Sequence, residues 1–246
     1  MRLDKYLSDM NLDSRSNLKK AIRKGSVTVD GQMVRDPAMA VPDGAEVTYC
    51  GRPVRHETFQ YYMLNKPAGV LSATSDRRQK TVLDLLPGER RTDLFPVGRL
   101  DKDTTGLLLI TNDGDMAHRL LAPKSHVDKV YEALILGRVG SREIEAFRSG
   151  LVVDETFTAA PAGLQVLSHP EDPEEEGRDL SLVRITIHEG KFHQIKRMFL
   201  AVGMEVLTLK RLSMGSLLLD PDLSEGECRR LTQEELDALE NLIMKN

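Results

Sequence analysis

The residues best suited to chemistry lie in one polar loop near the middle of the chain. The loop reads Gly98-Arg99-Leu100-Asp101-Lys102-Asp103-Thr104-Thr105-Gly106 and leads into an apolar run at 107–111. An Asp in a loop usually makes a turn or a cap. A carboxylate beside a binding site can instead act as a nucleophile, stabilise a cationic sugar or remove a proton. Asp101 is therefore the first candidate for a catalytic residue.

A second chemistry fits the same loop, because Asp101-x-Asp103-x-Thr105 matches the nucleophile pattern of magnesium-dependent phosphatases. That chemistry needs the Asp at the end of a hydrophobic strand. Here residues 96–99 form a poor strand, and the good strand follows the loop. No later pair of acids at the end of an apolar strand supplies a clear magnesium site. The phosphatase stays as a disfavoured alternative.

Two segments further along could complete a site around Asp101. Tyr131 shares a strand face with Ala133 and Ile135, which fits either core packing or an aromatic platform for a base. Lys196 lies at the start of a predicted helix and is either a surface residue or a counter-charge. Enclosing a carboxylate with a base raises its pKa, whereas a nearby cation lowers it. Lys196 is therefore the candidate that would keep Asp101 ionised.

The elements that must position these residues mix strands and helices without a regular repeat. Apolar or alternating runs predict strands at 61–64, 107–111, 130–136, 182–187 and 206–209. Helices are expected at 115–121, 141–149, 192–202 and 233–244, the last opening with a Thr232-x-x-Glu235 capping box. The order favours an α+β fold with a mixed, largely antiparallel sheet flanked by helices.

The first fifty residues look like a small separate module. Leu3, Tyr6, Leu7 and Met10 make one apolar helix face, and a second helix can begin at Ser14 or Ser16 and end at Gly25. The Asp30-Gly31 pair between β-prone runs predicts a hairpin. We expect this module and a linker to occupy 1–58 and a larger catalytic domain to occupy 59–246.

The second helix of this module carries a cationic stripe, with no acid between its first and last members to pair with it. Repulsion between like charges on one helix would be relieved by a polyanion, although a solvated face is the ordinary alternative. The stripe consists of Arg15, Lys19, Lys20, Arg23 and Lys24.

Overall composition limits the possible partners and compartments. The net charge is −4, but residues 1–58 carry ten basic and eight acidic residues, so the excess of acid lies in the remainder, partly in a predicted solvated loop at 171–179. Cys50 and Cys228 are too few and too far apart for a disulfide framework. No apolar run is long enough for a membrane span, and the amino-terminal residues do not resemble a signal peptide. We expect a reduced cytoplasmic protein without membrane contact.

Motifs for common cofactors are missing from the sequence. Neither a phosphate-binding Gly-x-x-x-x-Gly-Lys-Ser/Thr loop nor a dinucleotide-binding Gly-x-Gly-x-x-Gly occurs, and the six His lack the spacing of metal ligands. We therefore expect chemistry that needs no cofactor and no metal.

Two family resemblances unite these features. The segments Arg-Leu-Asp-Lys-Tyr-Leu, Ser-Arg-Ser with its basic helix, and Val-Thr-Val-Asp-Gly resemble the RNA-binding fold of ribosomal protein S4, over residues 1 to 50. The segment Met-Leu-Asn-Lys-Pro at 63–67, the Asp101 loop, Lys129-Val130-Tyr131 and the segment 189–198 resemble, in this order, the motifs of RNA pseudouridine synthases. Together the resemblances span nearly the whole chain.

The resemblance to the synthases implies a role for each matched position. Asp101 would be catalytic, Tyr131 would pack against the uracil and Lys196 would pair with Asp101. The resemblance leads us to expect Arg at the position of Lys196, so a bidentate pair becomes a point-charge contact. Arg99 is placed to contact RNA or fill the space that a flipped base leaves. Further RNA contacts are expected from Lys66, Thr105, His193, Gln194 and the cationic stripe.

Within the family, His-Gln-Ile-Lys-Arg-Met at 193–198 resembles the RsuA-type branch, which converts U516 of small-subunit 16S rRNA. Enzymes of the large subunit tend to have Arg-Gln-x-Arg-Arg-Met at this point. We therefore expect a monomeric enzyme that isomerises a uridine in 16S rRNA or a small-subunit assembly intermediate. A 23S rRNA synthase and a non-catalytic RNA-binding assembly factor remain the alternatives.

Overall fold

The computed structural model describes residues 1–88, 91–171, 175 and 177–245. The chain divides into two compact units. The first combines Met1–Gln60 with Leu86–Phe95, and the second combines Tyr61–Leu85 with Pro96–Asn246. This division differs from the contiguous one expected from the sequence, because a later segment returns to the first unit.

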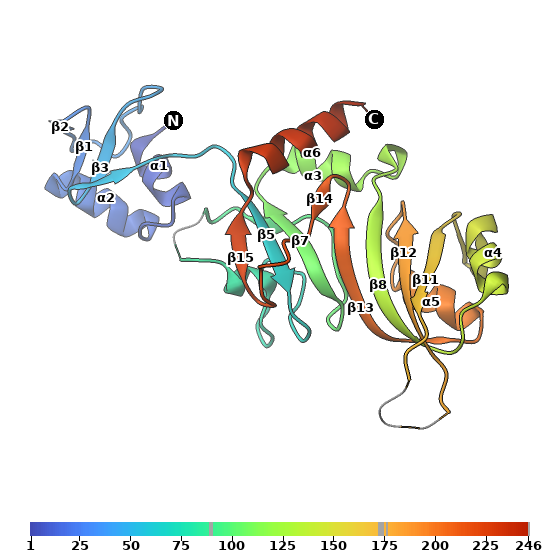
Figure 1. Cartoon of the computed structure of the whole chain (residues 1–246). Helices are drawn as coiled ribbons and strands as arrows, with labels where there is room; N and C mark the ends of the chain where they lie inside the picture. The colour runs from blue at the N-terminus through green and yellow to red at the C-terminus, as the bar shows by residue number, and fades with distance from the viewer. Residues whose placement is uncertain (89–90, 172–174, 176, 246) are drawn as a thin grey trace. The chain divides into compact units, whose positions relative to one another are not determined.

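Local sequence signals explain the elements of the first unit (Figure 1). The Ser14 side chain accepts a hydrogen bond from the backbone N–H of Asn17 and begins the second helix, and Gly25 ends it in the left-handed conformation. Asp30 and Gly31 both have positive φ, as a tight hairpin turn requires. The elements are α1 (Leu3–Asp9), α2 (Arg15–Lys24), β1 (Val27–Val29), β2 (Gln32–Met33), β3 (Val47–Tyr49) and β4 (Arg52–Val54).

The expectation of a linker from residue 51 was wrong for its first part. Cys50 and Gly51 both have positive φ and make a second tight turn, so Arg52–Val54 pairs with β3 as strand β4. The sheet of the first unit has the order β2-β1-β3-β4. Pro53 obscured this strand in the sequence, since Pro cannot donate to a ladder and is tolerated in strands chiefly at a sheet edge.

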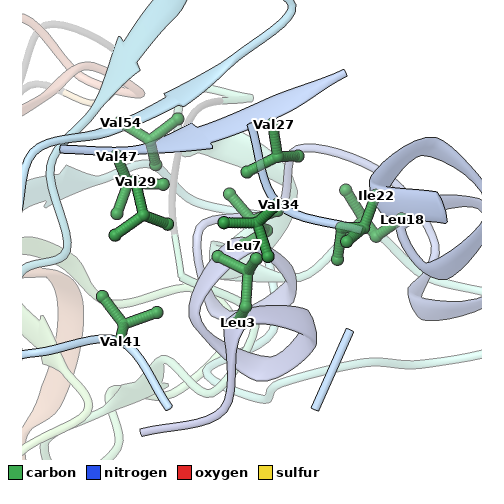
Figure 2. Packing of buried hydrophobic residues seen from close by; sticks show 10 residues of the cluster. All are labelled: Leu3, Leu7, Leu18, Ile22, Val27, Val29, Val34, Val41, Val47 and Val54. Atoms are coloured by element: carbon green, nitrogen blue, oxygen red, sulfur yellow. The ribbon is translucent and has the colours of Figure 1, made fainter. Parts of the chain in front are cut away.

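A small apolar core holds the first unit together (Figure 2). Leu3 and Leu7 from α1 face Leu18 and Ile22 from α2, and valines of the sheet close the cluster. The segment that returns to this unit is fixed by Arg91, which is buried and forms ion pairs with Asp9 and Asp93. The unit therefore has its own core, which positions the exposed side of α2.

The second unit is built around one large sheet. Along it the strands follow the order β11-β12-β8-β13-β7-β5-β15, with β14 paired to β13 (Figure 1). β13 and β7 run parallel, and the other neighbours in this order are antiparallel. The fold is therefore α+β with a mixed, mostly antiparallel sheet, as the sequence predicted.

Each strand and helix predicted for this unit is present, but β13 runs five residues beyond its predicted end, and the sequence did not predict β6, β9, β10, β11, β14 or β15. The strands are β5 (Tyr61–Lys66), β6 (Phe95–Pro96, at the junction of the units), β7 (Thr105–Thr111), β8 (Lys129–Leu136), β9 (Leu151–Asp154), β10 (Phe157–Ala159), β11 (Gly163–Ser168), β12 (Leu180–Ile187), β13 (Glu205–Met214), β14 (Leu217–Leu218) and β15 (Cys228–Arg230). The helices are η1 (Val82–Leu85), α3 (Gly114–Leu121), η2 (Pro123–Ser125), α4 (Ser141–Ser149), α5 (Gln194–Ala201) and α6 (Gln233–Lys245).

Strict alternation of burial along β8 places Tyr131, Ala133 and Ile135 on its buried face. Across the sheet Tyr131 lies opposite Ile185 of β12 and Arg211 of β13. The helices α4 and α5 pack beside β11 and β13, and Phe147 meets Phe199 between them. The aromatic ring of Tyr131 is thus held by the sheet rather than by a loop.

The parallel pair β7–β13 is short and depends on a glycine. Gly106 has φ +97°, and a Cβ at this position would lie 2.3 Å from the carbonyl oxygen of Arg211. Beyond this point Arg211 joins the two strands through its side chain, since its Nε donates to the Leu107 carbonyl at 2.7 Å. This close approach sets where the loop before β7 meets the sheet.

Three expectations concern other parts of the chain. Cys50 and Cys228 are both free thiols. The acidic loop predicted at 171–179 lies partly outside the described residues, which include 171, 175 and 177–179. Within the described part of the chain, no helix has the length and apolar character needed to cross a membrane.

Candidate active site

The loop that carries Asp101 is fixed from beneath by side chains of neighbouring segments. Ser72 bonds both backbone groups of Leu100, accepting from its N–H at 3.1 Å and donating to its carbonyl at 2.8 Å. The backbone N–H of Gly69 donates to the carbonyl of Lys102 at 2.8 Å, and that of Thr104 to the carbonyl of Asp101 at 3.1 Å. The backbone around Asp101 is therefore pre-formed.

Lys66 is the central support of this loop and not an RNA-facing residue, which corrects the expectation from the sequence. Its side chain is 0% exposed, and Nζ donates to the carbonyls of Pro67, Asp101, Lys102 and Thr104 at 2.9–3.2 Å. Burial lowers the pKa of Lys66 to about 8, and the charges of Asp103 and Asp101 oppose that shift. The positive charge of Lys66 therefore lies on the inner side of the loop, where it binds backbone carbonyls.

The start of α5 faces Asp101 with two basic side chains. His193 Nε2 lies 3.6 Å from one carboxylate oxygen of Asp101, and Lys196 Nζ lies 3.7 Å from the other. The Asp101 side chain is 26% exposed, so it is partly enclosed yet reachable. The pairing of Lys196 with Asp101 that the sequence suggested is thus present as a loose contact.

The nearer partner of Lys196 is Asp103. Lys196 Nζ donates to both carboxylate oxygens of Asp103, at 2.6 and 2.7 Å, and these bonds lower the pKa of Asp103. Asp103 is 71% exposed, whereas Lys196 is 26% exposed. Two acids therefore share one lysine, which holds positive charge over the mouth of the site.

One cavity joins these groups to the sheet. The residues that line it are Arg99, Leu100, Asp101, Thr104, Tyr131, Ile187, Gly190, Lys191, His193, Gln194, Ile195, Lys196 and Leu209. Six residues predicted for the site from the sequence are thus brought together, although they are spread over almost a hundred positions. Arg99 is exposed and has no ion pair with any described residue, so it is free to meet an anion.

Two other predictions need adjustment. Thr104, not Thr105, lines the cavity; its hydroxyl is buried and has no hydrogen-bond partner within the described residues. Gln194 is buried, and its side chain bonds the backbone N–H of Lys191 and the carboxylate of Glu189. Gln194 thus shapes the turn before α5 and offers little surface to RNA.

The cationic stripe of α2 is partly neutralised by an acid of α1, a contact that was not predicted from the sequence. Asp4 of α1 is buried and lies 3.4 Å from Arg15 and 3.7 Å from Lys19. Burial acts to raise the pKa of Asp4, but the hydrogen bonds from Arg2 and Arg15 leave it below its ordinary value. The exposed cations Lys20, Arg23 and Lys24 form no ion pair with any residue that the structure describes.

This geometry defines what the site can do. Asp101 presents an accessible carboxylate beside two basic groups, and a Tyr ring forms part of the same wall. Such a wall suits a planar base with its attached sugar. Within the described residues, no group of three His, Cys, Asp or Glu is arranged to hold a metal ion.

Three contributors were missed by sequence reasoning. Asp103 and Thr104 stand in the quoted motif, but only the fold shows that they face the site. Phe192 precedes His193 and is exposed, and its ring stacks on that of His193. An aromatic residue between a basic residue and a His was the signal that could have found it.

Comparison with known proteins agrees with this arrangement. A family model described as RNA pseudouridylate synthase matches residues 60–201, and the S4 domain matches residues 1–47. An uncharacterised RNA pseudouridine synthase of Bacillus subtilis, YtzG, is 47% identical over 97% of this chain and 98% of its own. The ribosomal small subunit pseudouridine synthase A of Escherichia coli K12 is 39% identical over 96% and 98%.

A solved structure supports the same conclusion for the fold. A crystal structure of a pseudouridylate synthase, 34% identical, covers 97% of this chain and 99% of its own with a TM-score of 0.66. The match to the family model spans the Asp101 loop, Tyr131 and the start of α5, and the relatives match over nearly their full length. The chain is therefore a member of the RNA pseudouridine synthase family, an isomerase with an amino-terminal S4 domain.

Proposed function

We propose that this protein converts a uridine of small-subunit 16S rRNA, U516, to pseudouridine with the carboxylate of Asp101 and without a cofactor. The observation that carries the proposal is the meeting of Asp101, Tyr131, His193 and Lys196 at one cavity. Relatives that match over nearly their full length bear the name ribosomal small subunit pseudouridine synthase A, which supports the choice of rRNA.

The reaction needs only groups that this site supplies. The bond from C1′ of the ribose to N1 of uracil breaks, a bond from C1′ to C5 forms, C5 loses its proton and N1, which carries no proton in uridine, gains one. Nothing is oxidised and nothing is added, so a positioned carboxylate suffices to assist the sugar or the base and to remove the proton. His193 Nε2 and Lys196 Nζ lie 3.6 and 3.7 Å from the two carboxylate oxygens of Asp101, where they can orient the carboxylate.

The base must leave its stack to reach Asp101, at a cost of a few kcal/mol. Tyr131 is in place to stack against the base, and a base–aromatic stack contributes about 1–3 kcal/mol. Arg99 is exposed at the rim and can hold the displaced backbone. We further propose that a monomer acts in the cytoplasm on 16S rRNA or an assembly intermediate.

Pseudouridine mapping of total rRNA tests this function directly. Cells with and without the protein should differ at one uridine of 16S rRNA, and the purified protein should restore the missing signal. A difference confined to 23S rRNA would contradict the proposal that 16S rRNA is the substrate. No difference at any uridine would favour the non-catalytic assembly factor.

The exposed cations of α2 are expected to bind RNA phosphates. Replacing Lys20, Arg23 and Lys24 together by Gln should weaken RNA binding. The slope of log affinity against log salt concentration should become less negative by about 2 to 3, because each phosphate contact contributes roughly 0.7–0.9 to the size of that slope. The measurement is RNA affinity at several salt concentrations. Asp4 should stay buried, because Arg15 and Lys19 are retained.

A matched control separates a local site from overall charge. Lys5, Arg52 and Arg55 are exposed in the same unit but lie outside α2, and their replacement by Gln changes the net charge equally. This control should leave the salt slope nearly unchanged. Equal slopes for the two triple variants would show that the α2 cations act only through total charge.

A further inference from the structure

The turn just before α5 presents an aromatic ring to solvent beside the cavity. Phe192 is 74% exposed, more than any other large hydrophobic side chain that the structure describes. Its ring lies 3.8 Å from the ring of His193 at an interplanar angle of 17°, so the two are stacked. One face of Phe192 is therefore covered by His193, and a large part of the ring is left in water.

This exposed ring is held in place rather than left on a loose loop. The turn is fixed by Gln194, which accepts a hydrogen bond from the backbone N–H of Lys191 at 3.0 Å and donates to Glu189 at 2.8 Å. Glu189 in turn accepts from the backbone N–H of Ala160, and Arg197 donates to the carbonyl of Phe192. His193 has φ +50°, a conformation that a residue other than glycine adopts only when its surroundings require it.

The Phe192–His193 pair lies at the edge of the cavity that contains Asp101. His193 lines the cavity, and its Nε2 lies 3.6 Å from a carboxylate oxygen of Asp101. The ring of Phe192, which does not line the cavity, stacks on the ring of His193. The adjacent Lys191 and the rim residue Arg99 are exposed cations suited to phosphates. An exposed aromatic face beside cations is the arrangement on which unpaired bases stack.

We propose that Phe192, backed by His193, is a stacking platform for the base of an unpaired nucleotide next to the target uridine. This inference rests on the proposed function and adds a second base site outside the cavity of Asp101. Stacking is tolerant of base identity, so the platform would position the strand rather than read its sequence. Phe192 is accordingly a positioning residue whose loss should act mainly on RNA binding.

The first test uses substitutions at Phe192 in pseudouridine formation on 16S rRNA. Phe192→Ala should lower kcat/KM by about 5- to 150-fold, the equivalent of one lost base–aromatic stack, mainly through a higher KM. Phe192→Tyr should retain most activity, whereas Phe192→Leu, which keeps apolar bulk without a ring, should resemble Ala. Leu activity equal to that of Phe would overturn the stacking platform.

The second test does not depend on the identity of the substrate. The chain has no Trp, so Phe192→Trp introduces a single fluorescent reporter at the proposed platform. In an Asp101→Asn background, binding of a uridine-containing single-stranded RNA oligonucleotide should quench its emission and protect it from acrylamide. The control is Leu218→Trp, which is 69% exposed on β14 and does not line the cavity.

The two tests fail in distinguishable ways. Quenching at position 192 but not at 218 supports the platform, and unchanged emission at 192 when the RNA is fully bound overturns it. Should the wild-type protein leave 16S rRNA unmodified, the substrate assignment fails, and the fluorescence result then decides the platform by itself.

Discussion

Asp101→Asn should abolish pseudouridine formation while the protein still binds RNA. Asn has the size of Asp but no charge, so it can neither assist the breaking of the glycosidic bond nor accept the proton. The backbone of the loop is fixed by Ser72 and Lys66 through main-chain groups of residues 100–104. These bonds survive the substitution, so the loss should lie in the chemical step. Activity should fall by at least about 10³-fold, comparable to the loss of an essential catalytic group.

Asp103→Asn is the matched control for this substitution. It makes the same change two residues away in the same loop and removes the nearer acidic partner of Lys196. Because Asp103 is exposed and Lys196 then keeps Asp101 as its partner, most activity should remain. Single-turnover rates on RNA and RNA affinity, measured for both variants, separate chemistry from binding. If Asp103→Asn were inactive and Asp101→Asn active, the catalytic residue would be Asp103 and not Asp101.

Much of this architecture could be predicted because local signals and tertiary structure agree. Ser14, Gly25 and the Asp30-Gly31 pair mark the ends of elements through backbone chemistry that depends on neighbouring residues alone. The alternation along β8 likewise assigned Tyr131 to the buried face. The order of the three motifs around Asp101, Tyr131 and Lys196 then indicated the site.

The features that were missed depend on contacts between distant segments. A lysine that binds four carbonyls cannot be told from a surface lysine by its neighbours in sequence, and this is the case for Lys66. Asp4 reaches Arg15 only when α1 packs on α2. Asp103 meets Lys196 across 93 positions of sequence. Each depends on side-chain direction in the folded state, which composition and spacing do not specify.

The buried ammonium of Lys66 leads to the second large prediction. Lys66→Met keeps the length of the side chain but removes every donor to the carbonyls of Pro67, Asp101, Lys102 and Thr104. Leaving buried acceptors without a partner should lower the free energy of unfolding by on the order of 3 kcal/mol. The loop would then shift, and a displacement of about 1 Å can cost on the order of 10² in rate. Lys80→Met, which removes an exposed lysine, should change neither quantity.

Titration of Lys66 gives this prediction a pH dependence whose sign is fixed. Burial lowers the pKa of Lys66 from 10.5 to about 8, so between these values the unfolded chain binds more protons than the folded one. The contribution of Lys66 to the free energy of unfolding therefore rises as pH increases from about 8 to about 10.5.

Lys129, whose pKa burial also lowers to about 8, is present in both the wild type and Lys66→Met, so its contribution cancels in the difference between them. The stability of the wild type minus that of Lys66→Met, measured by denaturant unfolding at several pH values, should thus grow across this window. A difference that is flat or falls with pH would mean that the four carbonyls keep Lys66 charged throughout, and that its role is set by hydrogen bonding alone.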